Sequence, residues 1–233
     1  MARRSTARKS TRRKSATARI DAAATPREKI IAAFMSLLAD KRIEEIDLAE
    51  IAEMAKASLA DFRGEFNSKL AILAAHMKQI DRAVLAKSSD AMADEPARDR
   101  LFDVLMRRLD AMAPHKSALR SLMRSATRHP GLALALNGLA VRSQQWMLSA
   151  AGISAAGPKG IIRAQGLALM FAGILRTFIE DDEDNSRTMA ALDRALASGQ
   201  RWSGLLDDLC RLAPRPGRRR RRRTREQDEA AAA

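Results

Sequence analysis

The chain has no tyrosine, and aromatic residues of all kinds make up only 3% of its 233 residues. A single cysteine, Cys210, excludes an intramolecular disulfide and a metal cluster built on cysteines. With so few aromatic residues the core has to consist mainly of Leu, Ile, Ala and Met, a composition that favours packed helices over sheets. The sequence therefore predicts an all-α fold.

Long hydrophobic runs are also missing. No stretch of 18 uninterrupted apolar residues is present to span a bilayer, and no apolar segment follows the basic N-terminus as it would in a secretory signal. The Arg- and Ser-rich start without acids resembles a mitochondrial presequence in composition alone. In the absence of other signals we expect a cytoplasmic protein.

Positive charge is concentrated at the two ends of the chain. The net charge is +14, and residues 1–20 hold eight Lys or Arg and no acid, while residues 211–233 hold nine Arg and three acids. These ends account for the whole net charge, so residues 21–210 are formally neutral. Electrostatic attraction to nucleic acid is therefore expected from the tails.

The sequence predicts four segments. A disordered basic arm (1–24) and a disordered Arg-rich tail (213–233) have almost nothing to bury. Between them we expect a domain with a helix-turn-helix arrangement (25–69) and a larger helical domain (70–212), whose functions the family resemblance described below implies.

Helix start signals define the first domain. Thr25-Pro26-Arg27-Glu28 places a capping Thr, a Pro at the first helical position and a Glu that closes a capping box. A second helix is expected over 47–55, with Asp47 as its cap, and a third over 59–66, capped by Ser58 with Asp61 completing the box. Two short helices joined by Lys56-Ala57 form a helix-turn-helix arrangement.

Helical periodicity continues through the rest of the chain. Ser68 is expected to cap a long fourth helix, and further helices are predicted over 101–112, 118–128, 132–150 and 161–180. A loop is predicted over 151–160. After an acidic turn at 181–185, a helix around Leu192 is expected to end near Gly199, before a last helix that contains Trp202.

Residues 30–73 resemble the DNA-binding domain of TetR/AcrR-type bacterial regulators. The resemblance lies in Ile30-Ile31-Ala32-Ala33, Ile51-Ala52 with Ala55, Ser58, Phe66-Asn67-Ser68-Lys69 and Leu73. It implies an all-α homodimer in which this domain precedes a variable helical domain that binds ligand. It also implies that double-stranded DNA is the partner and that the dimer forms through the last two long helices, here 161–180 and 187–210.

The same resemblance implies which residues meet DNA. They are Lys56, Ser58, Leu59, Ala60, Asp61, Arg63 and Lys69. The chain has Lys56 where the family usually has Gly, Asp47 where it has Thr and Arg63 where it has Tyr. Arg63 could donate to guanine or phosphate, and Asp61 could accept from cytosine or simply cap its helix. Residues 47–66 carry a net charge of minus 3, which places five acids beside the expected interface.

A second, shorter resemblance concerns the C-terminal part of the chain. Asp181-Asp182-Glu183-Asp184 and 188–194 are similar to the lipid-binding accessory protein of ubiquinone biosynthesis, which has a TetR-like fold. In that family a terminal amphipathic helix contacts membrane. The resemblance implies that the same contact is made here by Trp202, Leu205, Leu206 and Leu209, followed by Arg211. The alternative is that these residues close the core or the dimer.

No catalytic, metal or cofactor motif is recognisable, so an enzyme is not expected. His76, His115 and His129 fall on separate predicted elements and lack metal-binding spacing. A small apolar ligand would be enclosed by the helices between 101 and 180, and core packing explains the same side chains. The candidate pocket residues are Met106, Met123, Gln144, Trp146, Met147, Arg163, Met170 and Phe171.

Three functions therefore remain open. The leading prediction is a TetR-like DNA-binding transcriptional regulator, a repressor that releases DNA when an apolar ligand binds. The second is a TetR-fold protein that binds lipid or acts at a membrane surface and keeps a degenerate helix-turn-helix. The third is a nonspecific nucleic-acid binder in which the arginine-rich tails hold DNA and the fold only dimerises them.

Overall fold

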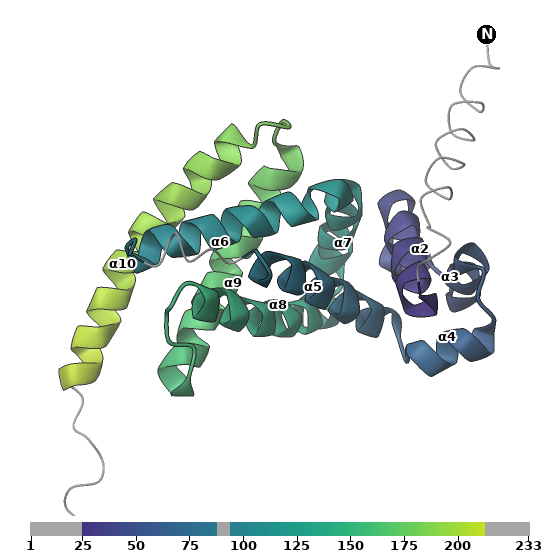
Figure 1. The fold of residues 1–233 in the computed structure, drawn as a ribbon, viewed down its shortest axis with the longest axis horizontal. Helices are drawn as coiled ribbons and strands as arrows, with labels where there is room; N and C mark the ends of the chain where they lie inside the picture. The colour runs from purple at the N-terminus through teal and green to yellow at the C-terminus, as the bar shows by residue number, and fades with distance from the viewer. Residues whose placement is uncertain (1–24, 88–93, 213–233) are drawn as a thin grey trace, which may run out of the picture. The chain divides into compact units, whose positions relative to one another are not determined.

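The structure is a computed structural model that describes residues 25–87 and 94–212, with side chains as far as residue 199. The regular structure of these residues is helical throughout, which confirms the all-α prediction (Figure 1). The predicted arm (1–24) and tail (213–233) lie outside the described residues. In chain order the elements are α2 (Pro26–Asp40), η1 (Ile43–Glu45), α3 (Leu48–Ala55), α4 (Leu59–Glu65), α5 (Lys69–Leu85), α6 (Ala97–Met112), η3 (Ala113–His115), α7 (Lys116–Arg128), α8 (Pro130–Ala150), α9 (Gly157–Glu180) and α10 (Ser186–Leu212).

The chain divides into two compact units, Met1–Leu192 and Asp193–Ala233. The first contains α2 to α9 and the start of α10, and the second contains the remainder of α10. The helix-turn-helix and the helices from α5 to the start of α10 therefore belong to one unit, and the expected domain boundary after residue 69 lies inside it.

The start of α2 follows the predicted capping chemistry. Thr25 Oγ1 accepts a hydrogen bond from the Glu28 backbone N–H at 3.3 Å, and the Glu28 carboxylate accepts one from the Thr25 N–H at 2.8 Å. Pro26 occupies the first helical position, where its missing N–H leaves no internal bond unmade. Local sequence is sufficient to fix this helix start.

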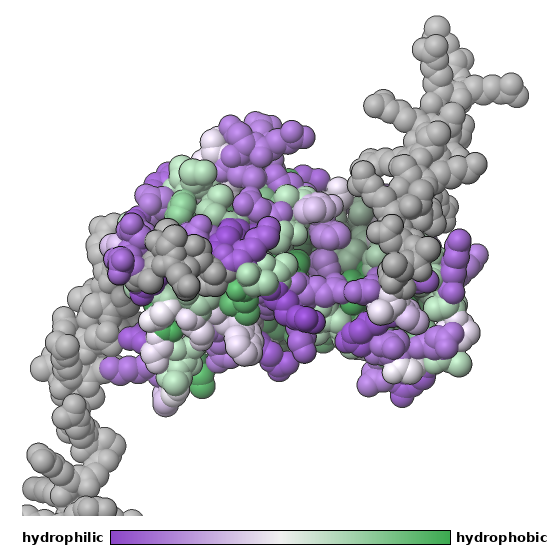
Figure 2. All heavy atoms as spheres, viewed as in Figure 1, coloured by the Kyte–Doolittle hydropathy of each residue, from purple (hydrophilic) through white to green (hydrophobic). Residues whose placement is uncertain are grey.

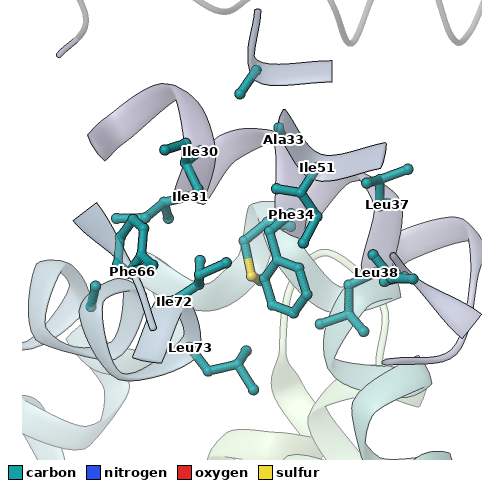
Figure 3. Close-up of a cluster of buried hydrophobic side chains, with 14 of the residues drawn as sticks. Ile30, Ile31, Ala33, Phe34, Leu37, Leu38, Ile51, Phe66, Ile72 and Leu73 are labelled. Atoms are coloured by element: carbon teal, nitrogen blue, oxygen red, sulfur yellow. The ribbon is translucent and has the colours of Figure 1, made fainter. Parts of the chain in front are cut away.

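An apolar core holds the first three helices together (Figure 3). Phe34 and Leu38 of α2 are fully buried and pack with Ile51 of α3 and Phe62 of α4. Further members come from α5, including Ile72 and Leu73, which Figure 3 shows beside the α2 side chains. Ala118 of α7 belongs to the same core, and Leu122, Leu132, Leu136 and Leu139 pack against it. This continuous core explains why no unit boundary separates the two predicted domains.

Two expectations about the C-terminal half were wrong. The predicted loop over 151–160 is shorter, because Gly157, at a φ of 67°, turns the chain directly into α9 and Pro158 occupies its first turn. Gly160 lets that turn pass the Ala155 carbonyl, where a Cβ would overlap. In addition, α10 runs through Gly199 without the expected break, because a single glycine inside a helix costs only about 1 kcal/mol.

Among the described helices, only α9 is long and apolar enough to cross a membrane by length and composition. From the sequence, α9 was not identified in this way, because only uninterrupted apolar runs were considered. One face of α9, including Ala164, Leu167, Phe171 and Ile174, is buried in the protein, and the helix packs along α8. Its apolar character is thus partly used by the helical bundle.

Candidate functional site

The turn between α3 and α4 has the geometry of a helix-turn-helix. Lys56 ends α3 in the left-handed region, with a φ of 55°, and the Ala57 N–H donates to the Ala52 carbonyl at 3.0 Å. This conformation favours glycine, so Lys56 keeps the turn at a cost of about 1 kcal/mol. The predicted capping bond from Asp47 is wrong, because its side chain makes no cap hydrogen bond in the structure.

Helix α4 has one buried residue and an exposed face. Phe62 is buried, and its ring lies 6.4 Å from that of Phe66. Leu59 is 58% exposed, although it is a large apolar residue, and Ala60 and Arg63 are exposed beside it. The residues that the sequence singled out on this helix therefore share its outer side.

The side chain of Asp61 forms hydrogen bonds at the start of its own helix. Its carboxylate accepts hydrogen bonds from the Ser58 hydroxyl at 2.6 Å and the Ser58 N–H at 3.2 Å, and Ser58 Oγ accepts from the Asp61 N–H at 3.1 Å. The hydrogen bonds from Ser58, led by its hydroxyl, lower the pKa of Asp61. Of the two roles left open for this residue, the structure shows capping.

Two of the five acids in residues 47–66 are paired with bases from α2 and the residue after it. Arg27 lies 3.2 Å from Glu65 and stacks on the Phe66 ring at 4.5 Å, and Lys41 lies 2.5 Å from Glu50. Exposed pairs add little stability. They nevertheless reduce the negative potential of a region that looks strongly acidic in the local sequence.

The predicted basic contacts differ in their surroundings. Arg63 is exposed and donates to Asn67 Oδ1, and Lys56 is exposed on the turn. Lys69 Nζ instead donates to the carbonyls of Ile43 and Ile46, at 2.6 and 2.8 Å. Its ammonium therefore ties the start of α5 to the η1 segment, a role that spacing along the chain could not reveal.

The candidate pocket residues do not form one group. Gln144, Met147 and Phe171 are buried, whereas Met106, Met123, Arg163 and Met170 are half-buried. Trp146 is 57% exposed in the single chain, unlike the buried members of this set. Leu134 of α8 is exposed as well, at 74%, and helical spacing alone could not tell which residues of an apolar helix face inward.

A buried polar cluster at the centre of the helical region was not anticipated. Arg108 of α6 donates to Asp81 of α5 and to the Ser143 hydroxyl of α8, and Ser143 Oγ also donates to Asp81 at 2.7 Å. Burial lowers the pKa of Arg108, and the neighbouring Asp81 opposes this effect. A partial sequence signal was present for the two charged residues, because Asp81 directly follows Ile80 and Arg108 directly precedes Leu109, and both of these apolar neighbours are buried.

His76 and His115, which the sequence assigned to separate elements, are in contact. Their ring centroids lie 4.6 Å apart in an edge-to-face arrangement. Burial, together with the adjacent His115, lowers the pKa of His76 to about 4, and burial also lowers the pKa of His115. No group of three His, Cys, Asp or Glu side chains among the described residues could hold a metal ion.

The buried histidine predicts acid sensitivity. An unfolded His76 takes up a proton near pH 6.5 while the folded one resists until about pH 4, so stability falls as the pH drops between these values. From pH 7 to 5 the decrease due to this residue is expected to be about 2 kcal/mol. Urea unfolding at both pH values should show a smaller decrease for His76→Phe, and an unchanged decrease would contradict the assignment.

The acidic turn before α10 also has a structural role. Asp181 accepts hydrogen bonds from the Thr188 N–H and hydroxyl, both at 2.6 Å, and the hydroxyl bond in particular lowers the pKa of Asp181. The match to the lipid-binding protein thus contains a helix-capping motif. The side chains of Trp202, Leu205, Leu206 and Leu209, on which a membrane contact depends, lie outside the described residues.

Comparison with solved structures identifies the fold. A TetR transcriptional regulator from Nitrosomonas europaea superposes with a TM-score of 0.59 at 23% identity, over 75% of this chain and 98% of that one. A TetR transcriptional regulator from Rhodococcus sp. RHA1 gives a TM-score of 0.53 at 20% identity, over 74% of this chain and 94% of that one. A second protein from the same organism, described as a transcriptional regulator, gives a TM-score of 0.51 at 21% identity, over 75% of this chain and 95% of that one. No protein-family model and no curated protein matches the sequence. The chain has the TetR fold, an N-terminal helix-turn-helix followed by a larger helical region.

Proposed function

We propose that the protein is a DNA-binding transcriptional regulator of the TetR type. The observation that carries this proposal is the helix-turn-helix, in which α4 is anchored by Phe62 while Leu59, Ala60 and Arg63 are exposed on its outer side. A helix of this kind enters the major groove, where an arginine donates to guanine and small apolar side chains contact thymine methyl groups. The transcriptional regulators that share the fold support the same function.

The net charge of residues 25–69 does not favour DNA binding, so basic residues elsewhere in the chain have to supply the attraction to phosphate. Residues 25–69 contain seven basic and nine acidic residues, so the domain by itself is repelled by phosphate. The arm that precedes α2 carries eight basic residues within residues 1–20. In this proposal the arm supplies phosphate contacts while α4 reads bases, and Lys69 positions α5.

Dimerisation is expected to use α9. Ile162, Gly166, Leu169 and Gly173 recur at helical spacing and are exposed, and Leu169 is 63% exposed. Figure 2 shows hydrophobic colour at the surface around the lower end of this helix. The two glycines permit close approach of a second helix, so a symmetric dimer through α9 would cover this apolar stripe.

Regulation is expected to work through the helical region. A ligand-induced shift there changes the spacing of the two α4 helices and releases DNA, as in a repressor. The continuous core between α2 and α7 provides the physical connection, because a movement of α7 cannot leave α2 unchanged.

The test is selection of random duplex DNA by the full chain, repeated at raised salt. We expect a two-fold symmetric motif, and Arg63→Ala should weaken discrimination at the base it contacts by about 1–3 kcal/mol, which corresponds to roughly 5- to 150-fold. Arg82→Ala, which removes an exposed arginine from α5, is the matched control and should retain the motif. Binding without any motif, insensitive to Arg63, would overturn the proposal.

A further inference from the structure

The guanidinium of Arg63 is held by an uncharged partner. Arg63 lies in the last turn of α4, and its Nη1 donates a hydrogen bond to Oδ1 of Asn67, four residues further along the chain. Both residues are exposed. Because a guanidinium only donates hydrogen bonds, the carboxamide has to turn its oxygen towards Arg63. The bond therefore orients Arg63 without neutralising its charge.

The acids closest to Arg63 along α4 are engaged with other residues. Asp61 accepts a hydrogen bond from the Ser58 hydroxyl at 2.6 Å, and the carboxylate of Glu65 lies 3.2 Å from Arg27. In the described part of the chain, neither acid forms an ion pair with Arg63. The positive charge of Arg63 is therefore available to a partner outside the protein.

The backbone on both sides of Asn67 is fixed by the fold. Phe66, which precedes it, is buried, and the Phe66 N–H donates to the Phe62 carbonyl at 2.9 Å. Ser68, which follows it, caps α5, because its Oγ accepts from the Ala71 N–H at 3.1 Å. Asn67 therefore presents its side chain from a well-defined position next to the end of α4.

The bond to Asn67 leaves one edge of the Arg63 guanidinium open. Nε and Nη2 share that edge, and no hydrogen bond within the described residues engages either atom. Their N–H groups point in the same direction, a geometry that matches the O6 and N7 acceptors of guanine in the major groove. An arginine that is already oriented also loses less side-chain freedom when it binds. Orientation by Asn67 therefore favours a specific contact with one base.

We propose that Asn67 is a positioning residue for DNA reading, which holds the Nε–Nη2 edge of Arg63 in place for bidentate hydrogen bonding to a guanine. This inference rests on the proposed DNA-binding function and specifies how α4 discriminates between bases. Asn67 acts through Arg63, so its influence is confined to the base pair that Arg63 contacts, and that pair is G·C in each half of the binding site.

The test measures the affinity of the full chain for the selected duplex and for duplexes changed at one base pair, the pair at which Arg63→Ala relaxes the selection. Fluorescence anisotropy at constant salt compares the unchanged chain with Asn67→Ala, Arg63→Ala and the double variant. Asn67→Ala should reduce the preference for G·C at that pair by about two- to tenfold, the value of one hydrogen bond. It should have no further effect when Arg63 is already alanine.

Asn67→Asp is the conservative control, because it keeps an acceptor oxygen beside Arg63 and adds a negative charge. It should lower the affinity for every duplex and preserve the preference at the same base pair. A purely structural role of Asn67 would instead lower the affinity of Asn67→Ala for all duplexes alike, since a disturbed helix-turn-helix affects every contact with DNA.

Three results would each overturn the inference: an unchanged preference in Asn67→Ala, an equal loss of affinity for all duplexes, or a loss of preference at a different base pair. An additional effect of Asn67→Ala in the Arg63→Ala background would also contradict it, because Asn67 would then act without Arg63. A full chain that selects no motif overturns both proposals, whereas a selected motif that does not depend on Asn67 overturns this one alone.

Discussion

Removal of residues 1–24 and 213–233 together is expected to lower affinity for random-sequence duplex DNA by about a thousandfold at low salt. These segments contain eight basic residues against one acid and eight arginines against three acids, which leaves a net charge of only +2 on residues 25–212. For every phosphate that the truncated chain no longer neutralises, the slope of log affinity against log salt concentration becomes shallower by about 0.9. Fluorescence anisotropy between 50 and 200 mM salt measures both quantities.

The same truncation separates a sequence-reading regulator from a nonspecific binder. If α4 reads bases, the truncated chain retains a preference for the selected motif over random DNA, although both affinities fall. If the tails hold DNA unaided, the preference is absent from the full chain as well. An arm of scrambled sequence is the control, since it keeps the charge and should restore nonspecific affinity. Full affinity in the truncated chain would contradict the assignment of the electrostatic contacts to the tails.

Asp81→Asn is expected to lower the free energy of unfolding by about 3–5 kcal/mol. Arg108 is 3% exposed, and its only described anionic partner is Asp81, so the substitution leaves a cation buried without a counterion. Urea unfolding at pH 7 measures the decrease. The effect arises from the cost of the remaining charge, not from the strength of the bond that is removed.

Two further variants test that explanation. Asp103→Asn removes the partner of Arg107, 2.7 Å away, from a pair that is partly exposed, and should cost no more than about 1 kcal/mol. The double change Asp81→Leu with Arg108→Met removes both charges and should recover most of the stability that Asp81→Asn removes. A double variant as unstable as Asp81→Asn would indicate that the ion pair itself, and not the unpaired cation, determines the decrease.

Local signals allowed much of the fold to be predicted. The capping boxes at Thr25 and Ser58 involve only residues three apart, so helix starts there follow from sequence and are confirmed. Two boundaries without a capping box were not predicted correctly. The start of α9 depends on Gly157, and the continuation of α10 through Gly199 depends on packing and propensity over many residues.

The site was predicted less completely. Sequence placed Leu59, Ala60 and Arg63 on one helix, and the structure exposes all three. It could not foresee that Arg27 and Lys41 would pair with Glu65 and Glu50, because those partners are 38 and 9 residues apart along the chain. The acidic character of the helix-turn-helix is thus partly compensated by tertiary contacts.

The sequence by itself determined the all-helical architecture, the two short helices of the helix-turn-helix with the Ser58 cap of the second, and the concentration of charge at the chain ends. These properties depend on composition and on neighbours within one or two helical turns. Only the tertiary structure decided that Lys69 binds two carbonyls, that Trp146 faces outward and that Arg108, Asp81 and Ser143 meet in the core. Each of these outcomes depends on how separate helices rotate and pack against one another, and helical periodicity gives the spacing of a stripe without identifying the stripe that another helix will cover.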